Sequence, residues 1–208
     1  MTFVQAAPRT LTKSTQEALL KATGKYSETF RDHMIFSIAL GTALRESEIQ
    51  ALNCGDVFNA NGQARERIQL RVWKRASKRL TAEEDRKRQV VAVPNILRHK
   101  LNKFRRWKIK NKQSVEYDAP LFMSRQKGNR ISTRQMRRLV REWQEKIGCD
   151  VILNFHALRH TSLTNLQRAN KDLSVTCSHA RHRSVETTMR YVQPSSEEMV
   201  EAVRGLQC

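Results

Sequence analysis

The chain has 208 residues with 39 Lys and Arg against 20 Asp and Glu, a formal net charge of +19, and 39% of its residues are hydrophobic. That hydrophobic share is too high for a disordered chain. No apolar run approaches the roughly 18 residues of a membrane span, and residues 1–20 lack the apolar stretch of a secretory signal. We therefore expect a soluble, cytoplasmic protein with no membrane partner, and so basic a chain is typical of those that bind nucleic acid.

Helices open the chain. Ser14 and Glu17 have the spacing of a capping box and predict the start of a first helix. A longer apolar stripe with helical spacing begins near Thr29 and is interrupted at Gly41. Ser47 is then predicted to cap a short third helix.

The hydrophobic period next changes to that of strands. Apolar residues alternate over 68–72, and a β-branched run over 90–93 stops at a proline. Residues 73–89 are mostly charged and predict a long hairpin loop or an elongated hairpin tip. Because two strands alone are marginally stable, we expect a third strand near 53–59, ahead of the Asn61-Gly62 turn signal.

Helices resume after the sheet. Apolar residues recur at helical spacing over about 95–111, 133–147, 156–169, 173–179, 185–191 and 195–207. Ser132 with Gln135 makes a capping box for the second of these helices. The last helix is amphipathic, and it packs either onto a neighbouring protomer or back on its own core. The pattern predicts an α+β fold that is mainly helical, with a small antiparallel three-stranded sheet.

A strongly basic stretch runs from Arg71 to Lys112 and holds sixteen Lys or Arg and only three acidic residues. Trp73, Phe104 and Trp107 are interleaved with these charges. An ordinary solvated face mixes both signs of charge. The excess of one sign therefore favours a surface that follows the phosphates of a nucleic acid.

Cysteines stand at positions 54, 149, 177 and 208, and no two of them have CxxC spacing. Cys177, His179 and His182 are close in sequence, but a zinc site needs four ligands in a recognisable spacing. We therefore treat the cysteines as reduced thiols and expect no metal and no other cofactor.

Three short segments, 41–49, 156–160 and 182–191, have the sequences GTALRESEI, HALRH and HRSVETTMRY. Each has an ordinary explanation when taken alone: a surface arginine, a hydrogen-bonded pair on one helix face, and a core tyrosine. Their order and spacing together resemble the tyrosine recombinase, or phage integrase, family. The resemblance runs over about residues 10–205.

The family's pattern comprises an arginine in a helix corner, a lysine on a hairpin, a His-x-x-Arg box, a further His or Trp, and a tyrosine nine residues later. The matching residues of this sequence are Arg45, Lys74, His156, Arg159, His182 and Tyr191. The chain departs from the pattern at two places. Ala180-Arg181 stand where the family usually has Leu-Gly, and the loop after Lys74 is longer than usual, so that Lys78 is a competing candidate.

The resemblance implies a DNA strand-exchange enzyme. Arg45 and Arg159 would clamp the scissile phosphate, because each guanidinium offers a planar fork of donors and stays charged. His156 would act as the base toward Tyr191, since a phenol with an ordinary pKa of about 10 is a poor nucleophile without one. The product would be a covalent 3′-phosphotyrosine, which keeps the bond energy and requires neither ATP nor a metal.

The resemblance also implies the supporting roles. His182 would hydrogen-bond the phosphate, Lys74 would donate a proton to the departing 5′-oxygen, and Glu48 would brace Arg45 from behind. Residues 1–208 would form a single catalytic domain, without the N-terminal core-binding domain of full-length members. The partners would be double-stranded DNA and, on that DNA, three further copies of the chain, whereas the free protein would be a monomer. The protein would be associated with the nucleoid.

Two other interpretations stay open at this point. A type IB topoisomerase uses a similar set of residues to relax supercoils, and a non-catalytic DNA-binding or architectural protein could use the same scaffold. Fold alone does not separate these functions. The target sequence, and the choice among integration, excision, inversion and resolution, also stay open.

Overall fold

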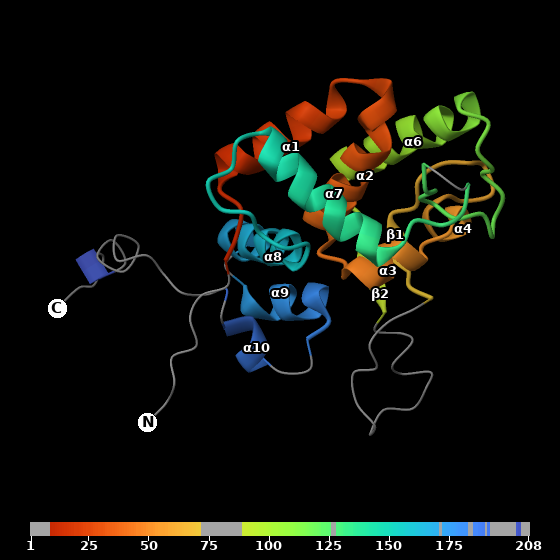
Figure 1. The fold of residues 1–208 in the computed structure, drawn as a ribbon. Helices are drawn as coiled ribbons and strands as arrows, with labels where there is room; N and C mark the ends of the chain where they lie inside the picture. The colour runs from red at the N-terminus through yellow and green to blue at the C-terminus, as the bar shows by residue number, and fades with distance from the viewer. Residues whose placement is uncertain are drawn as a thin grey trace.

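The computed structural model describes residues 9–71, 89–125, 128–170, 172–182, 185–189, 191 and 203–204. Its helices are α1 (Lys13–Gly24), the 3-10 turn η1 (Ser27–Thr29), α2 (Phe30–Thr42), α3 (Glu46–Ala51), α4 (Cys54–Val57), α6 (Asn95–Lys110), α7 (Thr133–Lys146), α8 (His156–Asn170), α9 (Leu173–Ala180) and α10 (Val185–Met189). Two short strands, β1 (Arg67–Gln69) and β2 (Val90–Ala92), accompany them (Figure 1). The predicted class, mainly helical with a small antiparallel sheet, is confirmed.

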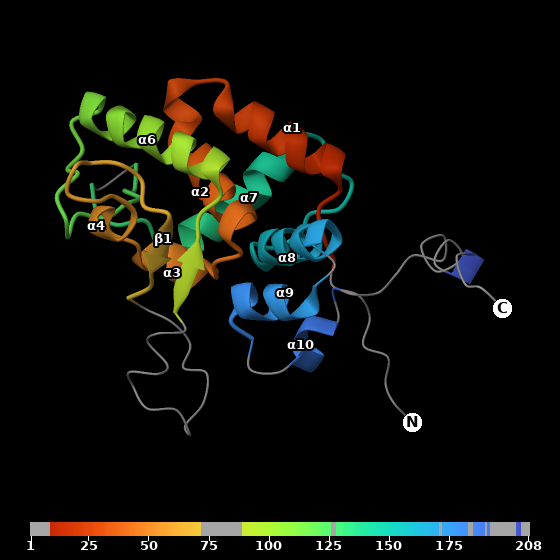
Figure 2. The ribbon, with the colours of Figure 1, turned by 180° about the vertical axis from the view of Figure 1, so that it is seen from behind.

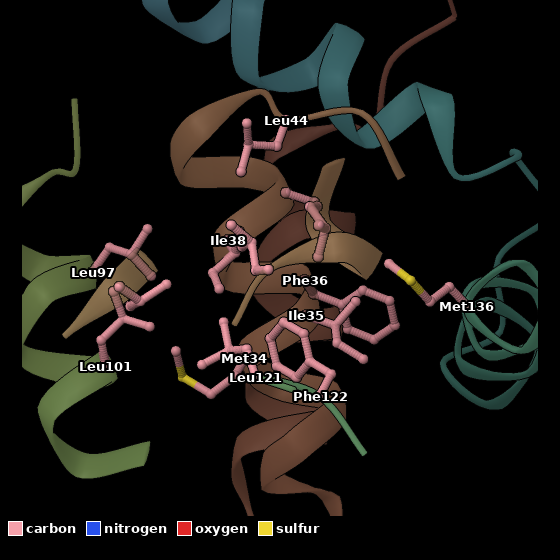
Figure 3. Close-up of a cluster of buried hydrophobic side chains, with 14 of the residues drawn as sticks. Met34, Ile35, Phe36, Ile38, Leu44, Leu97, Leu101, Leu121, Phe122 and Met136 are labelled. Atoms are coloured by element: carbon pink, nitrogen blue, oxygen red, sulfur yellow. The ribbon is translucent and has the colours of Figure 1, made fainter. Parts of the chain in front are cut away.

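Helix α2 is the centre of the hydrophobic core. Every residue over 31–39 is buried, and a helix buried on all sides needs partners around its whole circumference. Helices α1, α6 and α8 pack against it. Figure 3 shows its side chains between Leu97 and Leu101 of α6 and Met136 of α7. The corner that follows α2 is therefore attached to a tightly packed helix.

The sheet of the described residues has two antiparallel strands, with the buried residues Ile68 and Val91 opposite each other. The prediction of a third strand over 53–59 is wrong. This segment forms the short helix α4, because the Asp56 carboxylate accepts the backbone N–H of Asn53 at 2.8 Å and starts a helical turn there. The charged loop predicted over 73–89 lies almost wholly outside the described residues.

Capping determines where two of the helices begin. Helix α1 is capped by Thr12, whose hydroxyl accepts the backbone N–H of Thr15, and not by Ser14 as predicted. The cap predicted for α7 is confirmed, since the Ser132 hydroxyl accepts the N–H of Gln135 and the Gln135 side chain accepts the N–H of Ser132.

Two aromatic residues of the basic stretch pack in or against the hydrophobic core. Phe104 is fully buried, and its ring stacks on that of Trp107 with 5.3 Å between the centroids. The Trp107 indole N–H donates to the Ser27 carbonyl at 2.9 Å. Phe104 is therefore a core residue and Trp107 is partly buried against the core, while Trp73 lies outside the described residues. The phosphate-following surface itself stays a prediction.

The three helices α8, α9 and α10 lie one below the other in both Figures 1 and 2, with the hairpin of β1 and β2 to one side. Helix α8 packs against α2, α9 against α8, and α10 against α9. This stack brings the last two sequence motifs next to the corner that follows α2. The amphipathic helix predicted over 195–207 lies outside the described residues except for 203–204. None of the described helices combines the length and apolar composition of a membrane span.

Candidate active site

Arg159 joins two helix ends. Its side chain leaves α8 and is almost fully buried, with 2% of the residue exposed. One terminal nitrogen donates to the carbonyl of Ala43, which follows α2, and Nη2 donates at 2.6 Å to the carbonyl of Ala180, which ends α9. Carbonyls at helix ends have no partner inside the helix. The guanidinium therefore satisfies them and fixes both ends around itself.

Arg45 lies at the corner between α2 and α3 and is held by Glu48. It is the N-cap residue of α3, the position for which Ser47 was predicted. The Glu48 carboxylate accepts the backbone N–H of Arg45 at 2.8 Å and its Nη1 at 2.9 Å. The predicted brace is thus present as a contact. Glu48 also accepts Nη2 of Arg181 at 2.6 Å, while the Arg45 side chain keeps 28% of its surface exposed.

Tyr191 lies against this corner. It is 7% exposed and packs in a small apolar cluster with Ala43, Leu163 and Ala180. Its hydroxyl lies 2.7 Å from Nδ1 of His160, a residue of α8. The structure therefore places the predicted nucleophile beside a histidine.

His160 was not among the predicted site residues. It follows Arg159 directly and comes four residues after His156, so that helical spacing puts the two histidines on one face of α8. The two rings meet edge to face with 4.5 Å between their centroids. The same spacing in the sequence HALRH could have identified His160.

His182 completes the group. Its ring stacks near that of Tyr191 with 6.1 Å between the centroids, and its Nδ1 lies 2.9 Å from the hydroxyl of the buried Thr188. The residues Arg45, His156, Arg159, His182 and Tyr191 are thus brought together from α2–α3, α8 and the α9–α10 segment.

The charges of the site follow from burial and from the arginines. Burial, followed by the charges of Arg159 and Arg45, lowers the pKa of His182 to about 4, so its imidazole is neutral at pH 7. Partial burial and the same two arginines also lower the pKa of His156. Burial lowers the pKa of Arg159 to about 9, which still leaves it charged at pH 7. Neutral imidazoles beside charged guanidiniums suit proton transfer near an anion.

The profile of the phage integrase family matches residues 9–198. The chain belongs to this family. The family resemblance inferred from the three motifs is thereby confirmed, and the match includes the corner, both histidine motifs and Tyr191.

Curated members of the family resemble the chain over most of its length. The tyrosine recombinase XerC of Thermodesulfovibrio yellowstonii is 28% identical over 204 residues, which cover 95% of this chain and 62% of that protein. XerC of Actinobacillus pleuropneumoniae is 25% identical over 173 residues, or 83% of this chain and 50% of that protein. The chain therefore spans between half and two thirds of the length of these relatives.

Solved structures of the family share the fold. The crystal structure of XerA recombinase superposes with a TM-score of 0.74 at 21% identity, covering 98% of this chain and 68% of that one. XerH recombinase in its pre-cleavage complex superposes with a TM-score of 0.68 at 20% identity, covering 97% of this chain and 53% of that one. At this level of identity the likeness extends to the fold alone.

Two further expectations from the family pattern concern the lysine and metals. Lys74 and its competitor Lys78 both lie outside the described residues, so the hairpin lysine stays a prediction. In the described ranges, no three His, Cys, Asp or Glu side chains are grouped as a metal site would require.

A basic groove opens beside the site. It has a volume of about 570 Å³ and is lined by Arg134, Arg137, Arg138 and Arg141 of α7 together with residues 152–155. The last of these residues directly precedes His156 on α8. A polyanion in the groove would thus run up to the first histidine of the site.

Acidic pH is expected to destabilise the fold. Burial lowers the pKa of His33, which lies beneath α1, to about 4, as it does for His182. The unfolded chain protonates these rings near pH 6.5, so between about pH 6.5 and 4 it binds more protons than the folded chain and stability is lost as pH falls. Thermal unfolding followed by circular dichroism should show the melting temperature falling through this window. His182→Asn should make the slope shallower, and a flat profile in the unsubstituted protein would contradict the expectation.

Proposed function

We propose that this chain is the catalytic part of a site-specific DNA recombinase that cleaves and rejoins double-stranded DNA through a bond between Tyr191 and a backbone phosphate. The observation that carries the proposal is the convergence of the Tyr191 hydroxyl, three histidines and the charged Arg45 and Arg159, in a chain of the phage integrase family. Solved relatives of this fold include XerH bound to its difH substrate and the Tn1549 transposon integrase in complex with circular intermediate DNA. They support double-stranded DNA as the partner.

In the proposed cleavage step, the Tyr191 oxygen bonds to phosphorus while its proton passes to a histidine. The bond from phosphorus to the 5′-oxygen breaks, and that oxygen takes up a proton and leaves as a hydroxyl. Charged guanidiniums stabilise the negative charge that grows on the non-bridging oxygens. Attack by a 5′-hydroxyl reverses the step and rejoins the strands, so the phosphoester bond energy is kept and we expect no need for ATP or a metal.

His160 is the histidine that we propose as the proton acceptor. The sequence assigned this role to His156, but Nδ1 of His160 lies 2.7 Å from the Tyr191 hydroxyl, which is the range that proton transfer requires. In the tautomer with an unprotonated Nδ1, the ring accepts the hydroxyl hydrogen. His156, in edge contact with this ring, would then orient it. Proton donation by Lys74, or by Lys78, to the 5′-oxygen stays part of the proposal.

The proposal is tested with a pool of nicked duplexes that have a randomised core. Strand cleavage next to a nick releases a short oligonucleotide that carries the 5′-hydroxyl. Because this oligonucleotide diffuses away, rejoining is prevented, and the enzyme stays on the DNA as an adduct that survives denaturation. We expect such adducts in buffer with EDTA and without ATP, and peptide mapping should place the DNA on Tyr191. Binding without any adduct would favour the architectural alternative. Relaxation of a supercoiled plasmid without joining of two duplexes would favour the topoisomerase alternative.

His160→Gln is expected to slow adduct formation by about 10²-fold, because glutamine keeps a polar contact to Tyr191 and cannot take up its proton. The rate is measured in single turnover at saturating DNA, on a sequence recovered from the pool. His99→Gln, on the exposed face of α6, is the matched control and should cleave at the unsubstituted rate. Equal rates for the His160 variant and this control would remove His160 from the mechanism.

The assembly and the DNA path belong to the same proposal. We propose that DNA follows the basic groove of α7 toward the site, and that four protomers act on two duplexes, as the family resemblance implies. The steep fall of affinity with salt that accompanies phosphate binding would support the path. Light scattering on DNA, with and without the tail over 195–207, would test the assembly and the role of the tail.

A further inference from the structure

Arg181 occupies a backbone position that an L side chain rarely adopts. It is the C-cap residue that follows α9, and its φ of 53° puts it in the left-handed region. Glycine is the usual residue at such a helix end, because it has no Cβ. The family pattern also has Leu-Gly at 180–181. The chain therefore carries a long charged side chain where neither the backbone nor the family requires one.

The guanidinium of Arg181 is buried and only partly bonded. Its side chain is 3% exposed, and Nη2 donates to Glu48 at 2.6 Å. Its Nε and Nη1 are also buried and have no hydrogen-bond partner among the described residues. Buried donors without partners lower stability, as does the left-handed backbone. The presence of arginine at this position is therefore not explained by a gain in the stability of the fold. Backbone strain of this kind is concentrated at functional sites.

The contacts of Arg181 lead to the predicted phosphate clamp. Glu48, which is fully buried, divides its carboxylate between Arg181 and Arg45. The preceding carbonyl, that of Ala180, accepts a hydrogen bond from Arg159. The guanidiniums of Arg45, Arg159 and Arg181 face the single carboxylate of Glu48, so this group has two positive charges in excess. With glycine at 181 the excess would be one.

We propose that Arg181 is a positioning residue of the phosphate clamp, which holds and neutralises Glu48 so that Arg45 presents its full charge to the scissile phosphate. This inference rests on the proposed function. Without Arg181, the whole charge of Glu48 would fall on Arg45 and draw it away from an anion. Arg181 acts through Glu48 and need not touch the DNA.

Three substitutions test the proposal. Arg181→Met removes the charge and keeps the length, Arg181→Gly restores the residue of the family pattern, and Arg181→Lys keeps the charge. The matched control is Arg98→Met on α6, because Arg98 also forms one ion pair with a glutamate, Glu66, and also has a buried Nε without a partner. The readouts are the single-turnover rate of adduct formation at saturating DNA, the affinity for DNA and the melting temperature.

We expect the methionine and glycine variants to form the adduct about 10- to 100-fold more slowly, by analogy with the loss of residues that support metal ligands from behind. Their affinity for DNA should fall by no more than about tenfold, because the clamp holds one of many phosphates that the protein contacts. The glycine variant should melt at the same temperature or higher. The lysine variant should recover most of the rate. Unchanged rates for the methionine and glycine variants would overturn the proposal. It would also be overturned if every variant that lost rate also had a lower melting temperature, and if the lysine variant recovered neither the rate nor the melting temperature.

A second readout does not depend on DNA cleavage. Inorganic phosphate is titrated into the protein while the imidazole resonances of His156 and His182 are followed by NMR. Arg181→Met should weaken the binding of phosphate by about tenfold, and Arg98→Met should leave it unchanged. Equal binding by the two variants would overturn the role of Arg181. If the protein formed no adduct with DNA but its phosphate binding still depended on Arg181, only the proposed recombinase activity would be overturned.

Discussion

Tyr191→Phe is expected to abolish covalent attachment to DNA while DNA binding persists. The substitution removes one oxygen, and the ring keeps its packing against Ala43, Leu163 and Ala180. The substitution removes the 2.7 Å contact between the hydroxyl and His160. Because the removed atom is the nucleophile itself, we expect adduct formation to fall by at least about 10⁴-fold, as for other enzymes that lose their nucleophile.

The measurement is the fraction of nicked duplex that becomes attached to protein after denaturation, together with the affinity for the same duplex. Tyr26→Phe is the matched control, because Tyr26 is 54% exposed and lies after α1, outside the site. It should form the adduct at the unsubstituted rate. An adduct formed by the Tyr191 variant at a comparable rate would show that another residue is the nucleophile.

Arg159→Lys is expected to lower both activity and stability, although the charge is kept. An ammonium group cannot reproduce the planar fork that reaches the carbonyls of Ala43 and Ala180 together. One of these buried carbonyls would lose its donor, and the phosphate would lose a preorganised one. We expect adduct formation to slow by about 10²- to 10³-fold, the usual effect of removing one such donor.

Arg130→Lys separates the two effects. Arg130 also donates to two backbone carbonyls, those of Gln50 and Leu52, and its second terminal nitrogen donates to the Asn53 side chain, a bond that lysine would lose. Within the described residues its hydrogen bonds do not involve the tyrosine or the histidines of the site. This control should lower the melting temperature and leave the single-turnover rate of the folded protein unchanged. If both lysine variants lost stability and neither lost rate, Arg159 would have a structural role only.

The sequence predicted the helices well because their signals are local. The Ser132–Gln135 capping box and the apolar periods of α6, α7 and α8 lie within each segment and need no information from elsewhere in the chain. The strand expected over 53–59 failed because the Asp56 side chain starts a helical turn, and capping by one carboxylate outweighed a weak strand pattern.

The site divides in the same way. The family resemblance carried by the motifs pointed to Arg45, Arg159 and Tyr191, which the structure brings together. The contact between His160 and Tyr191 joins residues 31 apart in sequence, and that between Glu48 and Arg181 joins residues 133 apart. Such contacts depend on the stacking of α8 on α9 and α10, which no local pattern encodes. The place of Lys74 depends on the hairpin and stays a prediction.

Helix α8 carries His156, Arg159 and His160 within little more than one turn, and this arrangement limits how the gene can vary. Adding or deleting a single codon in this stretch would rotate everything beyond it by about 100° around the helix axis. Arg159 and His160 would then swing away from their partners in one event, while Leu163 would leave the apolar cluster around the tyrosine. Length changes among descendants of this sequence should therefore accumulate in connecting loops, and α8 should diverge through codon replacement alone.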